Sequence, residues 1–265
     1  MTNKTKGTAL ITGASTGIGA VYADRLARRG YDLVLVARNV DRLKTLAAGL
    51  SKETGRSVET ITADLTDKAD LARVETRLRD DASITLLVNN AGIGSSIPLL
   101  DANVDKMEYL IALNVTALTR LTYAAAPGFV ARGAGTFINV ASIVAIAPEF
   151  LNGVYGGSKA FVLALSQSLH HELGDKGIRV QAVLPGATAT EFWGIAGTPL
   201  EHIPAEALMT AENMVDAALA GFDQGELVTI PALQNDAHWH AFEAARRELG
   251  PHLSKSSPAS RYGIA

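Results

Sequence analysis

The sequence of 265 residues contains no cysteine, which excludes disulfide bonds, thiol nucleophiles and metal sites built from thiolates. No run of about eighteen uncharged apolar residues is present, so no membrane span is expected. The first residues, MTNKTKG, lack the apolar region and the small-residue cleavage site of a signal peptide. A net charge of −3 gives no sign of nucleic acid or an anionic membrane as partner. These absences favour a cytoplasmic location.

What the sequence does contain is a regular alternation of short apolar segments and amphipathic ones. Hydrophobic residues make up 48% of the chain, which is ample for a large core. The alternation predicts an α/β fold, a parallel sheet covered by helices on both faces. Strands are expected at 7–12, 31–37, 57–62, 84–89, 135–140, 178–184 and 226–231, and helices at 17–29, 40–51, 67–80, 105–132, 155–173 and 211–222.

Neither a linker, nor a repeat, nor a low-complexity run divides the chain, so residues 1–265 are expected to form a single domain. Pro127 and Gly128 should bend or interrupt the helix that contains them. Residues 187–209, rich in glycine and proline, are expected to form a mobile lid loop over the substrate. Residues 232–265 are expected to form a polar tail that packs on the body or on a neighbouring subunit.

A glycine-rich turn, TGASTGIG at residues 12–19, lies between the first expected strand and the first expected helix. This is the context of a dinucleotide-binding fingerprint, in which glycines permit a tight turn and let a pyrophosphate approach the backbone. The amino end of the following helix favours phosphate through its free N–H groups and its dipole. The spacing differs from G-x-G-x-x-G, and similar turns occur in proteins that bind no nucleotide.

A tyrosine and a lysine four residues apart, Tyr155 and Lys159, follow Ser142 in the sequence. On a helix the two side chains share one face. The ammonium should favour the phenolate and lower the tyrosine pKa from its usual value of about 10. With the serine hydroxyl holding a substrate oxygen, the phenol would exchange a proton with an alcohol or ketone. The same tyrosine–lysine spacing is also common on ordinary surface helices.

Six motifs stand in one register between residues 12 and 190: the glycine turn, NNAG at 89–92, Asn114, Ser142, Y-x-x-x-K at 155–159 and Pro185-Gly186. In these motifs, and in length, the chain resembles the smaller, single-domain branch of the short-chain dehydrogenase/reductase family. The resemblance implies a Rossmann-type, doubly wound sheet of about seven parallel strands with a dinucleotide bound beyond the strand carboxyl ends. It also implies a homodimer or homotetramer, assembled through the helices before and including Tyr155.

For catalysis, the resemblance implies that Tyr155 is the general acid and base, and that Lys159 tunes it and holds the nicotinamide ribose. Ser142 would orient and polarise the substrate carbonyl. The backbone of Asn114 would help to hold a water molecule that links Lys159 to solvent; the alternative is a core asparagine that bends its helix. Gly156 and Gly157 replace the family's more usual alanine or serine and leave this mechanism standing.

For the cofactor, the resemblance implies NADP(H), because the second strand ends in Ala37-Arg38 with no carboxylate to repel a 2′-phosphate. The family's other basic position is Thr16 here, and Arg38 has the alternative of a solvated strand end. Asp64 should reach the adenine amino group or, alternatively, cap the next helix. The positions assigned to the cofactor are Gly13, Ser15, Thr16, Gly17, Ile18, Gly19, Arg38, Asp64, Leu65, Asn90, Ala91, Gly92, Tyr155, Lys159, Pro185, Gly186, Thr188 and Thr190.

Two further groups of residues complete the sequence-based interpretation. Phe192, Trp193, Ile195 and Leu200 are expected to line the lid loop over an apolar substrate, unless the segment is only a tolerated insertion. The histidine pairs at 170–171 and at 238 and 240 have no third ligand at suitable spacing, so no metal site is expected.

The sequence thus predicts an NADP(H)-dependent carbonyl reductase, a ketoreductase that acts on a small to medium apolar ketone. One alternative is a 3-oxoacyl-thioester reductase of lipid synthesis, which would use the same residues. An alternative of another class is a non-catalytic NADP-binding sensor or scaffold, which should have lost residues such as Ser142 or Tyr155. Neither nucleic acid nor a membrane is expected as a partner.

Overall fold

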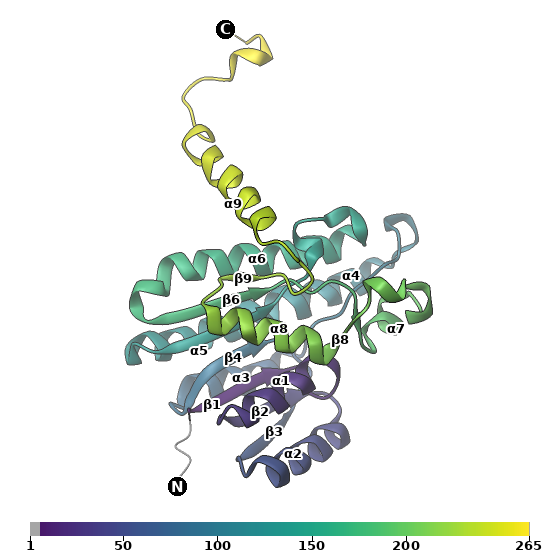
Figure 1. Ribbon diagram of the computed structural model, residues 1–265, viewed down its shortest axis with the longest axis vertical. Coiled ribbons are helices and arrows are strands. Elements are labelled where there is room, and N and C mark those ends of the chain that lie inside the picture. Colours follow the sequence, from purple (N-terminus) through teal and green to yellow (C-terminus); the bar gives the residue numbers. More distant parts are fainter. Residues whose placement is uncertain (1–5, 265) are drawn as a thin grey trace. The chain divides into compact units, whose positions relative to one another are not determined.

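The computed structural model describes residues 6–264 (Figure 1). The chain forms two compact units, Met1–Pro231 and Ala232–Ala265. The segment that argued against a signal peptide includes residues 1–5, which lie outside the described residues. No helix within 6–264 has the length and apolar character needed to span a bilayer.

The larger unit is built on a seven-stranded parallel sheet in the order β3-β2-β1-β4-β5-β6-β9. The predicted parallel sheet of seven strands is confirmed. The inner strands β1 and β5 are buried along their length because helices cover both faces, whereas the edge strand β3 exposes part of each face. The strands are β1 (Thr8–Thr12), β2 (Asp32–Ala37), β3 (Val58–Thr62), β4 (Ile84–Asn89), β5 (Gly135–Val140), β6 (Ile178–Val183) and β9 (Val228–Thr229).

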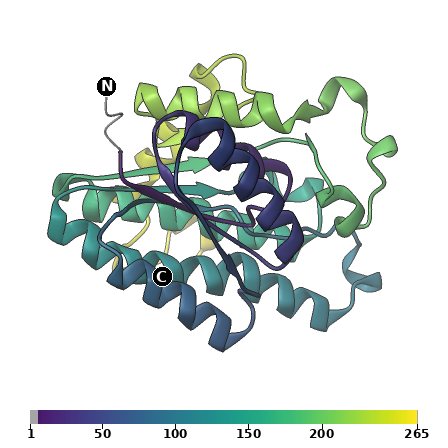
Figure 2. The same cartoon turned by 90° about the horizontal axis from the view of Figure 1, so that it is seen from below.

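The sheet of the larger unit has a layer of helices from the same unit on each face (Figure 2). One core cluster joins the strands to apolar side chains of α1 (Gly17–Arg28), α2 (Val40–Thr54) and α8 (Ala211–Gln224). The other joins them to α3 (Lys68–Asp80), α5 (Leu118–Arg132) and the carboxyl half of α6 (Gly153–Leu173). The strand order reverses between β1 and β4, and this switch point is where doubly wound sheets open a binding crevice.

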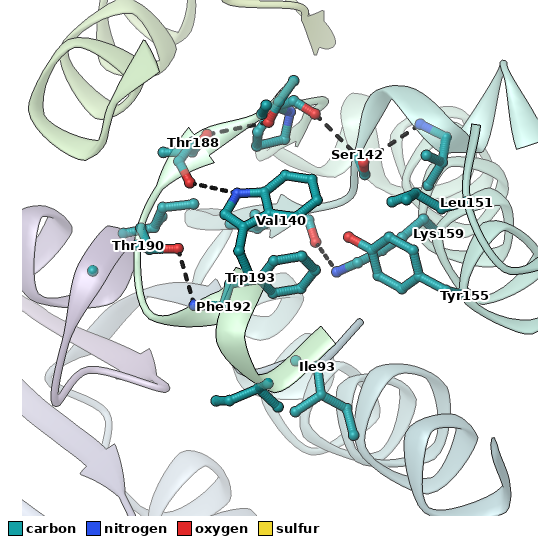
Figure 3. A pocket seen from close by; sticks show the side chains of 18 of the residues that line it. Ile93, Val140, Ser142, Leu151, Tyr155, Lys159, Thr188, Thr190, Phe192 and Trp193 are labelled. Carbon is teal, nitrogen blue, oxygen red and sulfur yellow. Dashed lines mark hydrogen bonds between the residues drawn. The ribbon is translucent and has the colours of Figure 1, made fainter. Parts of the chain in front are cut away.

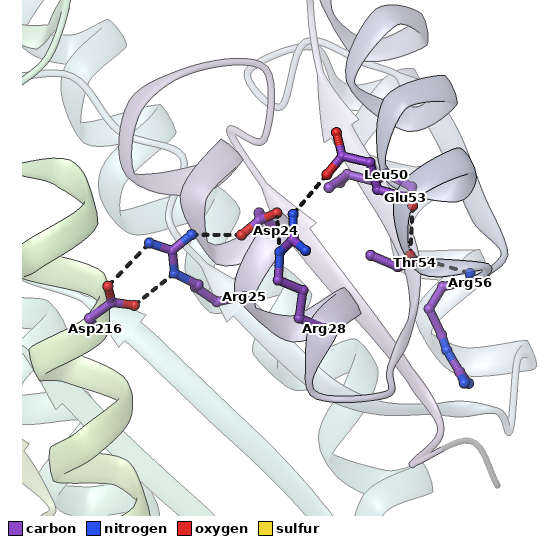
Figure 4. A network of polar contacts seen from close by, with 8 residues as sticks. All are labelled: Asp24, Arg25, Arg28, Leu50, Glu53, Thr54, Arg56 and Asp216. Carbon is purple, nitrogen blue, oxygen red and sulfur yellow. Dashed lines mark hydrogen bonds and ion pairs between the residues drawn. The ribbon is translucent and has the colours of Figure 1, made fainter. Parts of the chain in front are cut away.

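Ion pairs connect the helices of the first layer on their solvent side (Figure 4). Arg25 of α1 binds Asp216 of α8 at 2.7 Å, and Arg28 of α1 binds Glu53 of α2 at 2.7 Å. Exposed pairs of this kind contribute about 1 kcal/mol or less each. The layer is therefore held mainly by its apolar core, and the ion pairs align the three helices.

The long helix predicted over 105–132 is divided into three parts, and it differs from the prediction in two ways. The α-helix α4 (Val104–Ile111) passes through a π-helical segment at Ala112–Ala117 into α5. Pro127 lies inside α5 without ending it. The hydrogen bond that proline cannot make would have ended on the carbonyl of Tyr123, whose residue is 70% exposed, so water can satisfy that carbonyl.

The lid loop contains more regular structure than its composition suggests. Two short strands, β7 (Thr188–Ala189) and β8 (Met209–Thr210), pair in parallel and close the base of the loop. Between them lie a short helix, α7 (Phe192–Ala196), and two 3-10 turns. The smaller unit of the chain contains a 13-residue helix, α9 (Ala237–Leu249), within the segment predicted as a polar tail.

Candidate active site

The glycine turn between β1 and α1 is built around positions where a side chain would collide. Gly13 and Gly17 have positive φ angles of 65° and 53°. A Cβ on Gly13 would lie 2.9 Å from the Cα of Ala91, and one on Gly19 would overlap the carbonyl oxygen of Gly13. The turn therefore brings the start of α1 close against the carboxyl end of β1, as a dinucleotide fingerprint requires.

Asn90 holds this turn in place from the neighbouring strand β4. Its side-chain amide donates to the carbonyls of Thr12 and Gly13 at 2.9 and 3.2 Å. Its own backbone N–H donates to the hydroxyl of Thr12 at 3.0 Å. The NNAG segment thus contributes to the site by fixing the backbone of the glycine turn.

The amino end of α1 lacks a cap from its own sequence. Thr16 is the N-cap residue, and its side chain makes no capping hydrogen bond. A helix start of this kind presents N–H groups and a positive dipole end to an anion. The geometry fits the phosphates of a dinucleotide.

Helix α6 places Tyr155 and Lys159 at its first two turns, on the side that faces β5 and the cavity. Asn152 caps the helix, because its side-chain oxygen accepts from the N–H groups of Val154 and Tyr155 at 2.9 and 3.4 Å. The side-chain amide of Asn152 donates to the carbonyl of Ile97 at 2.7 Å. The cap therefore fixes both the helix start and the neighbouring loop.

The phenol and the ammonium are both almost completely buried. Burial raises the pKa of Tyr155 to about 12, and a hydrogen bond with Ser142 acts in the opposite direction. Burial lowers the pKa of Lys159 to about 8. The Nζ atom lies 5.9 Å from the centre of the tyrosine ring and donates to the carbonyl of Val140 at 2.9 Å. The tyrosine pKa thus moves opposite to our expectation, because loss of solvent outweighs the hydrogen bond with Ser142.

Asn114 lies in the π-helical segment and is buried. Its side-chain oxygen accepts from the N–H of Ile93, and its amide donates to the Ile93 carbonyl and to the hydroxyl of Ser158. A Cβ on Gly92 would lie 3.0 Å from the asparagine oxygen and 3.4 Å from the lysine nitrogen. The asparagine therefore ties the NNAG loop to the catalytic helix.

These elements surround a cavity of about 580 Å³ (Figure 3). Its walls combine polar side chains with apolar ones, and the lid loop contributes Phe192, Trp193 and Ile195 to the apolar part. Trp193 donates from its indole to the carbonyl of Thr188 at 2.9 Å, and the side chain of Thr190 accepts from the N–H of Phe192 at 3.3 Å. The predicted residues that line the cavity are Gly13, Thr16, Gly17, Ile18, Asn90, Ala91, Gly92, Ser142, Tyr155, Lys159, Pro185, Gly186, Thr188, Thr190, Phe192, Trp193 and Ile195.

Several predicted cofactor residues do not line this cavity. Leu65 is 5% exposed and packs in the core. Asp64 accepts from the N–H and the hydroxyl of Thr66, and the residue that caps α3 is Asp67. The capping alternative for Asp64 is therefore wrong. Ser15, Gly19, Asn114 and Leu200 also lie outside the cavity lining.

Arg38 lies at the end of β2, outside the cavity lining, with its side chain 61% exposed. Its guanidinium donates to the hydroxyl of Tyr109 at 2.9 Å and lies 4.0 Å from the carboxylate of Asp64. An exposed, forked cation beside the glycine turn can bind a phosphate group. Tyr109, a partner of this arginine, was not identified from the sequence, because it stands 71 residues away.

A family model described as short chain dehydrogenase matches residues 7–198. The chain belongs to this family. The match covers the glycine turn, the NNAG loop and both Tyr155 and Lys159 of α6, so the geometry above lies within the part that the family shares. The predicted family and Rossmann-type fold are confirmed.

Solved structures of this dehydrogenase family that are similar over nearly the whole chain include the following two. A short-chain dehydrogenase from Sphingobium yanoikuyae in complex with NADPH is 54% identical, with a TM-score of 0.94, and the match covers 97% of this chain and 99% of that one. A bulky-bulky ketone specific alcohol dehydrogenase from Comamonas testosteroni is 47% identical, with a TM-score of 0.90, covering 98% and 99%.

Two curated relatives in the dehydrogenase family are longer proteins than this chain. A very-long-chain 3-oxoacyl-CoA reductase from Anas platyrhynchos is 36% identical over 192 residues, which are 69% of this chain and 60% of that protein. The protein of the same name from Rattus norvegicus is 36% identical over 205 residues, which are 75% of this chain and 64% of that protein. The chain thus spans less than two thirds of the length of these relatives.

Asn152 and Gly94 are further residues of the site that the sequence did not reveal. Asn152 precedes an expected helix, and an asparagine at that place is a capping signal that the sequence does contain. Gly94 carries no comparable signal, because its importance depends on Phe192, which stands far away in the sequence.

Proposed function

We propose that this protein is an NADP(H)-dependent carbonyl reductase that interconverts a ketone and a secondary alcohol. One observation carries the proposal: Tyr155, Lys159 and Ser142 meet at a cavity whose lining also contains many apolar side chains. The relative from Sphingobium yanoikuyae, in complex with NADPH, and the ketone-specific enzyme from Comamonas testosteroni support it.

The residues assigned to the cofactor fit a dinucleotide. The glycine turn and the uncapped start of α1 suit the pyrophosphate, and Arg38 suits a 2′-phosphate, which supports NADP(H) over NAD(H). The NNAG residues would hold the adenosine side, and Thr188 and Thr190 the carboxamide. When bound, NADP(H) supplies or accepts the hydride. The protein's contribution is binding, orientation and proton transfer.

In the direction of reduction, the Tyr155 hydroxyl donates its proton to the substrate oxygen. Its raised pKa keeps the phenol protonated at neutral pH, so the group is ready as an acid. Ser142, hydrogen-bonded to the phenol, orients the same substrate oxygen. Lys159 carries a positive charge that favours the phenolate left after transfer, and its Val140 contact keeps the ammonium in place. The π-helical segment around Asn114 lies beside this pair and suits a proton route to solvent.

The substrate we propose is an apolar ketone with substituents on both sides of the carbonyl. The walls around the catalytic group include Ile93, Val144, Leu151, Phe192 and Trp193. The only charged side chains that line this cavity within the described chain are Lys159 and Glu191. An apolar ketone would bury its substituents there without desolvating a charge of its own.

The test replaces Tyr155 with phenylalanine, which removes only the hydroxyl. We expect NADPH to bind with nearly unchanged Kd, while kcat for a ketone falls at least about a hundredfold, the usual size of acid–base catalysis. Binding is measured by fluorescence of the reduced nicotinamide and turnover by its absorbance. A variant that retained full turnover would show that another group is the acid.

A second candidate is the reduction of a 3-oxoacyl thioester, which the curated 3-oxoacyl-CoA reductase relatives favour. The same catalytic residues would serve it. A panel of acyl thioesters and simple ketones, compared by kcat/KM, separates the two; preference for thioesters would reject the ketone proposal. The non-catalytic alternative is disfavoured because Asn114, Ser142, Tyr155 and Lys159 are all present.

We also propose that the protein works in the cytoplasm as a homodimer or homotetramer. Without cysteine the chain forms no disulfide bond, so its fold does not depend on an oxidising compartment. The oligomer rests on the resemblance to the family, and sedimentation of the full chain tests it.

A further inference from the structure

Gly94, near the cavity, has no side chain where the ring of Phe192 lies, and its backbone does not require glycine for a turn. A Cβ on Gly94 would overlap the Cζ atom of Phe192 and would lie 2.8 and 3.1 Å from two further ring carbons. The two residues stand far apart in sequence, one in the loop after β4 and the other at the start of α7. Gly94 is not among the glycines with positive φ, so its backbone would accept alanine.

The ring of Phe192 is held on two further sides by aromatic contacts. Its centroid lies 5.7 Å from that of Tyr155 and 5.4 Å from that of Trp193, the second contact being edge-to-face. These rings lie together at the cavity in Figure 3. Phe192 also packs on the small apolar cluster formed by Leu110, Val144 and Tyr155. With Gly94 and these rings around it, the cavity is the side toward which Phe192 can be displaced.

We propose that Gly94 and Phe192 form a size gate beside the catalytic phenol, which admits ketones with an aromatic substituent next to the carbonyl. The proposal rests on the ketone reduction proposed above. A substrate oxygen within hydrogen-bond reach of the Tyr155 hydroxyl places the adjoining substituent beside the ring that packs on that tyrosine. A planar aromatic group fits there, because offset or edge-to-face contact with Phe192 and Trp193 is favourable.

The absence of a side chain at Gly94 keeps the gate open. An alanine there would force the Phe192 ring toward the cavity, where it would occupy the space of the substituent. A change of one methyl group in an apolar pocket alters selectivity by about 10- to 200-fold. The three atoms nearest to the added methyl group all belong to the Phe192 ring. The effect of the methyl group should therefore vanish when the ring is removed.

The experiment is a double-mutant cycle of Gly94→Ala and Phe192→Ala with benzophenone as the probe. Trp193 lies against the gate, so quenching of its fluorescence reports benzophenone binding without turnover. Every variant carries Trp239→Phe, which removes the other tryptophan. Gly49→Ala is the matched control, because a Cβ at that helix position meets nothing within 4 Å. Kd for NADPH and kcat/KM for acetone and benzophenone are measured alongside.

We expect Gly94→Ala to raise the benzophenone Kd at least about tenfold when Phe192 is present, and by less than about twofold when it is alanine. Gly94→Ala should lower kcat/KM for benzophenone at least about tenfold more than kcat/KM for acetone, and the NADPH Kd should change by less than about threefold. Three results would overturn the gate. The first is an equal loss of benzophenone affinity on Gly94→Ala with Phe192 present and with Phe192 replaced by alanine. The others are a loss of benzophenone affinity in the Gly49→Ala control, and no quenching by benzophenone when Gly94 is unchanged.

The comparison of Phe192→Ala with the double variant does not require the single Gly94 variant to fold. Equal benzophenone affinity in these two supports the gate, and a tenfold weaker double variant overturns it. If the wild type binds benzophenone and NADPH but reduces no ketone, the proposed function fails while the quenching cycle still decides the gate.

Discussion

Lys159 is the residue at which stability and chemistry oppose each other. Its ammonium is buried, with the carbonyl of Val140 as its hydrogen-bond acceptor, and burial lowers its pKa to about 8 from 10.5. A lysine whose folded-state pKa lies below its unfolded value destabilises the fold at every pH where both states are protonated. At neutral pH the fold therefore carries the cost of this charge.

The first prediction concerns Lys159→Met, which keeps the length of the side chain and removes the charge. We expect the free energy of unfolding at pH 7 to rise by about 2 kcal/mol, after allowance for the unpaired Val140 carbonyl, while ketone turnover is lost. Between pH 8 and 10.5 the unfolded state binds more protons, so the wild type gains stability with pH. The variant should lack that gain in urea titrations; a variant less stable than wild type at pH 7 would contradict the argument.

The second prediction concerns the choice of cofactor at Arg38. Reversal of charge in Arg38→Asp should raise the NADPH Kd at least about tenfold more than the NADH Kd, because a charge-assisted contact is replaced by repulsion. Tyr109→Phe removes the hydroxyl that accepts a hydrogen bond from the guanidinium, and it should raise the NADPH Kd a few-fold. Fluorescence titrations of the reduced nicotinamide measure both Kd values. An equal rise of the NADPH and NADH Kd values in Arg38→Asp would contradict a contact between Arg38 and the 2′-phosphate.

At the scale of elements, the start of α6 connects three segments of the site. Asn152 caps the helix and binds the carbonyl of Ile97. In the same loop, the N–H and the hydroxyl of Ser96 both donate to the carbonyl of Ala196 at the end of α7, at 2.9 Å. The catalytic helix, the loop after β4 and the lid loop are therefore joined by hydrogen bonds.

The third prediction tests this connection with Asn152→Ala. We expect a loss of about 1–2 kcal/mol in the free energy of unfolding, the usual cost of a lost cap, together with a fall in kcat and little change in the NADPH Kd. Asn103→Ala is the control, because Asn103 caps α4 through the N–H of Lys106. Asn152→Asp keeps the capping oxygen and should recover most of the stability. Equal kinetic effects of the two alanine variants would contradict a positioning role.

At the scale of the whole molecule, the hydrophobic core belongs to the larger unit. Every buried apolar side chain among the described residues lies at or before Val228, and Glu243 is the single buried residue in the described part of the smaller unit. Burial of apolar surface is the main source of stability. The larger unit therefore contains the interactions that stabilise the sheet.

The fourth prediction is that a chain ending at Pro231 still folds. We expect its free energy of unfolding to change by less than about 1 kcal/mol and its NADPH Kd to remain unchanged, since the lost segment contributes no apolar core. Urea unfolding followed by circular dichroism measures the first and fluorescence titration the second. Loss of the cooperative transition would show that residues 232–265 are required for the fold.

The sequence predicted the strands well because each buried strand is a short apolar run, bounded by turn residues. The residues that it assigned to catalysis stand in spaced motifs, and Ser142, Tyr155 and Lys159 line one cavity in the structure. The sequence predicted that Pro127 would bend or interrupt its helix, and the helix is not interrupted there. No residue pattern indicates the π-helical segment. The sequence also predicted the wrong direction for the pKa of Tyr155, since burial by distant segments decides that value.

Local patterns by themselves determined the order of strands and helices, the glycine turn and the family, because period, propensity and motif spacing act between near neighbours in the chain. Tertiary structure alone decided which distant residues meet: Asn90 with the glycine turn, Tyr109 with Arg38, and Gly94 with Phe192. The physical reason is that solvent exclusion and steric contact depend on positions in space, which become fixed only when the sheet and its two helix layers pack together.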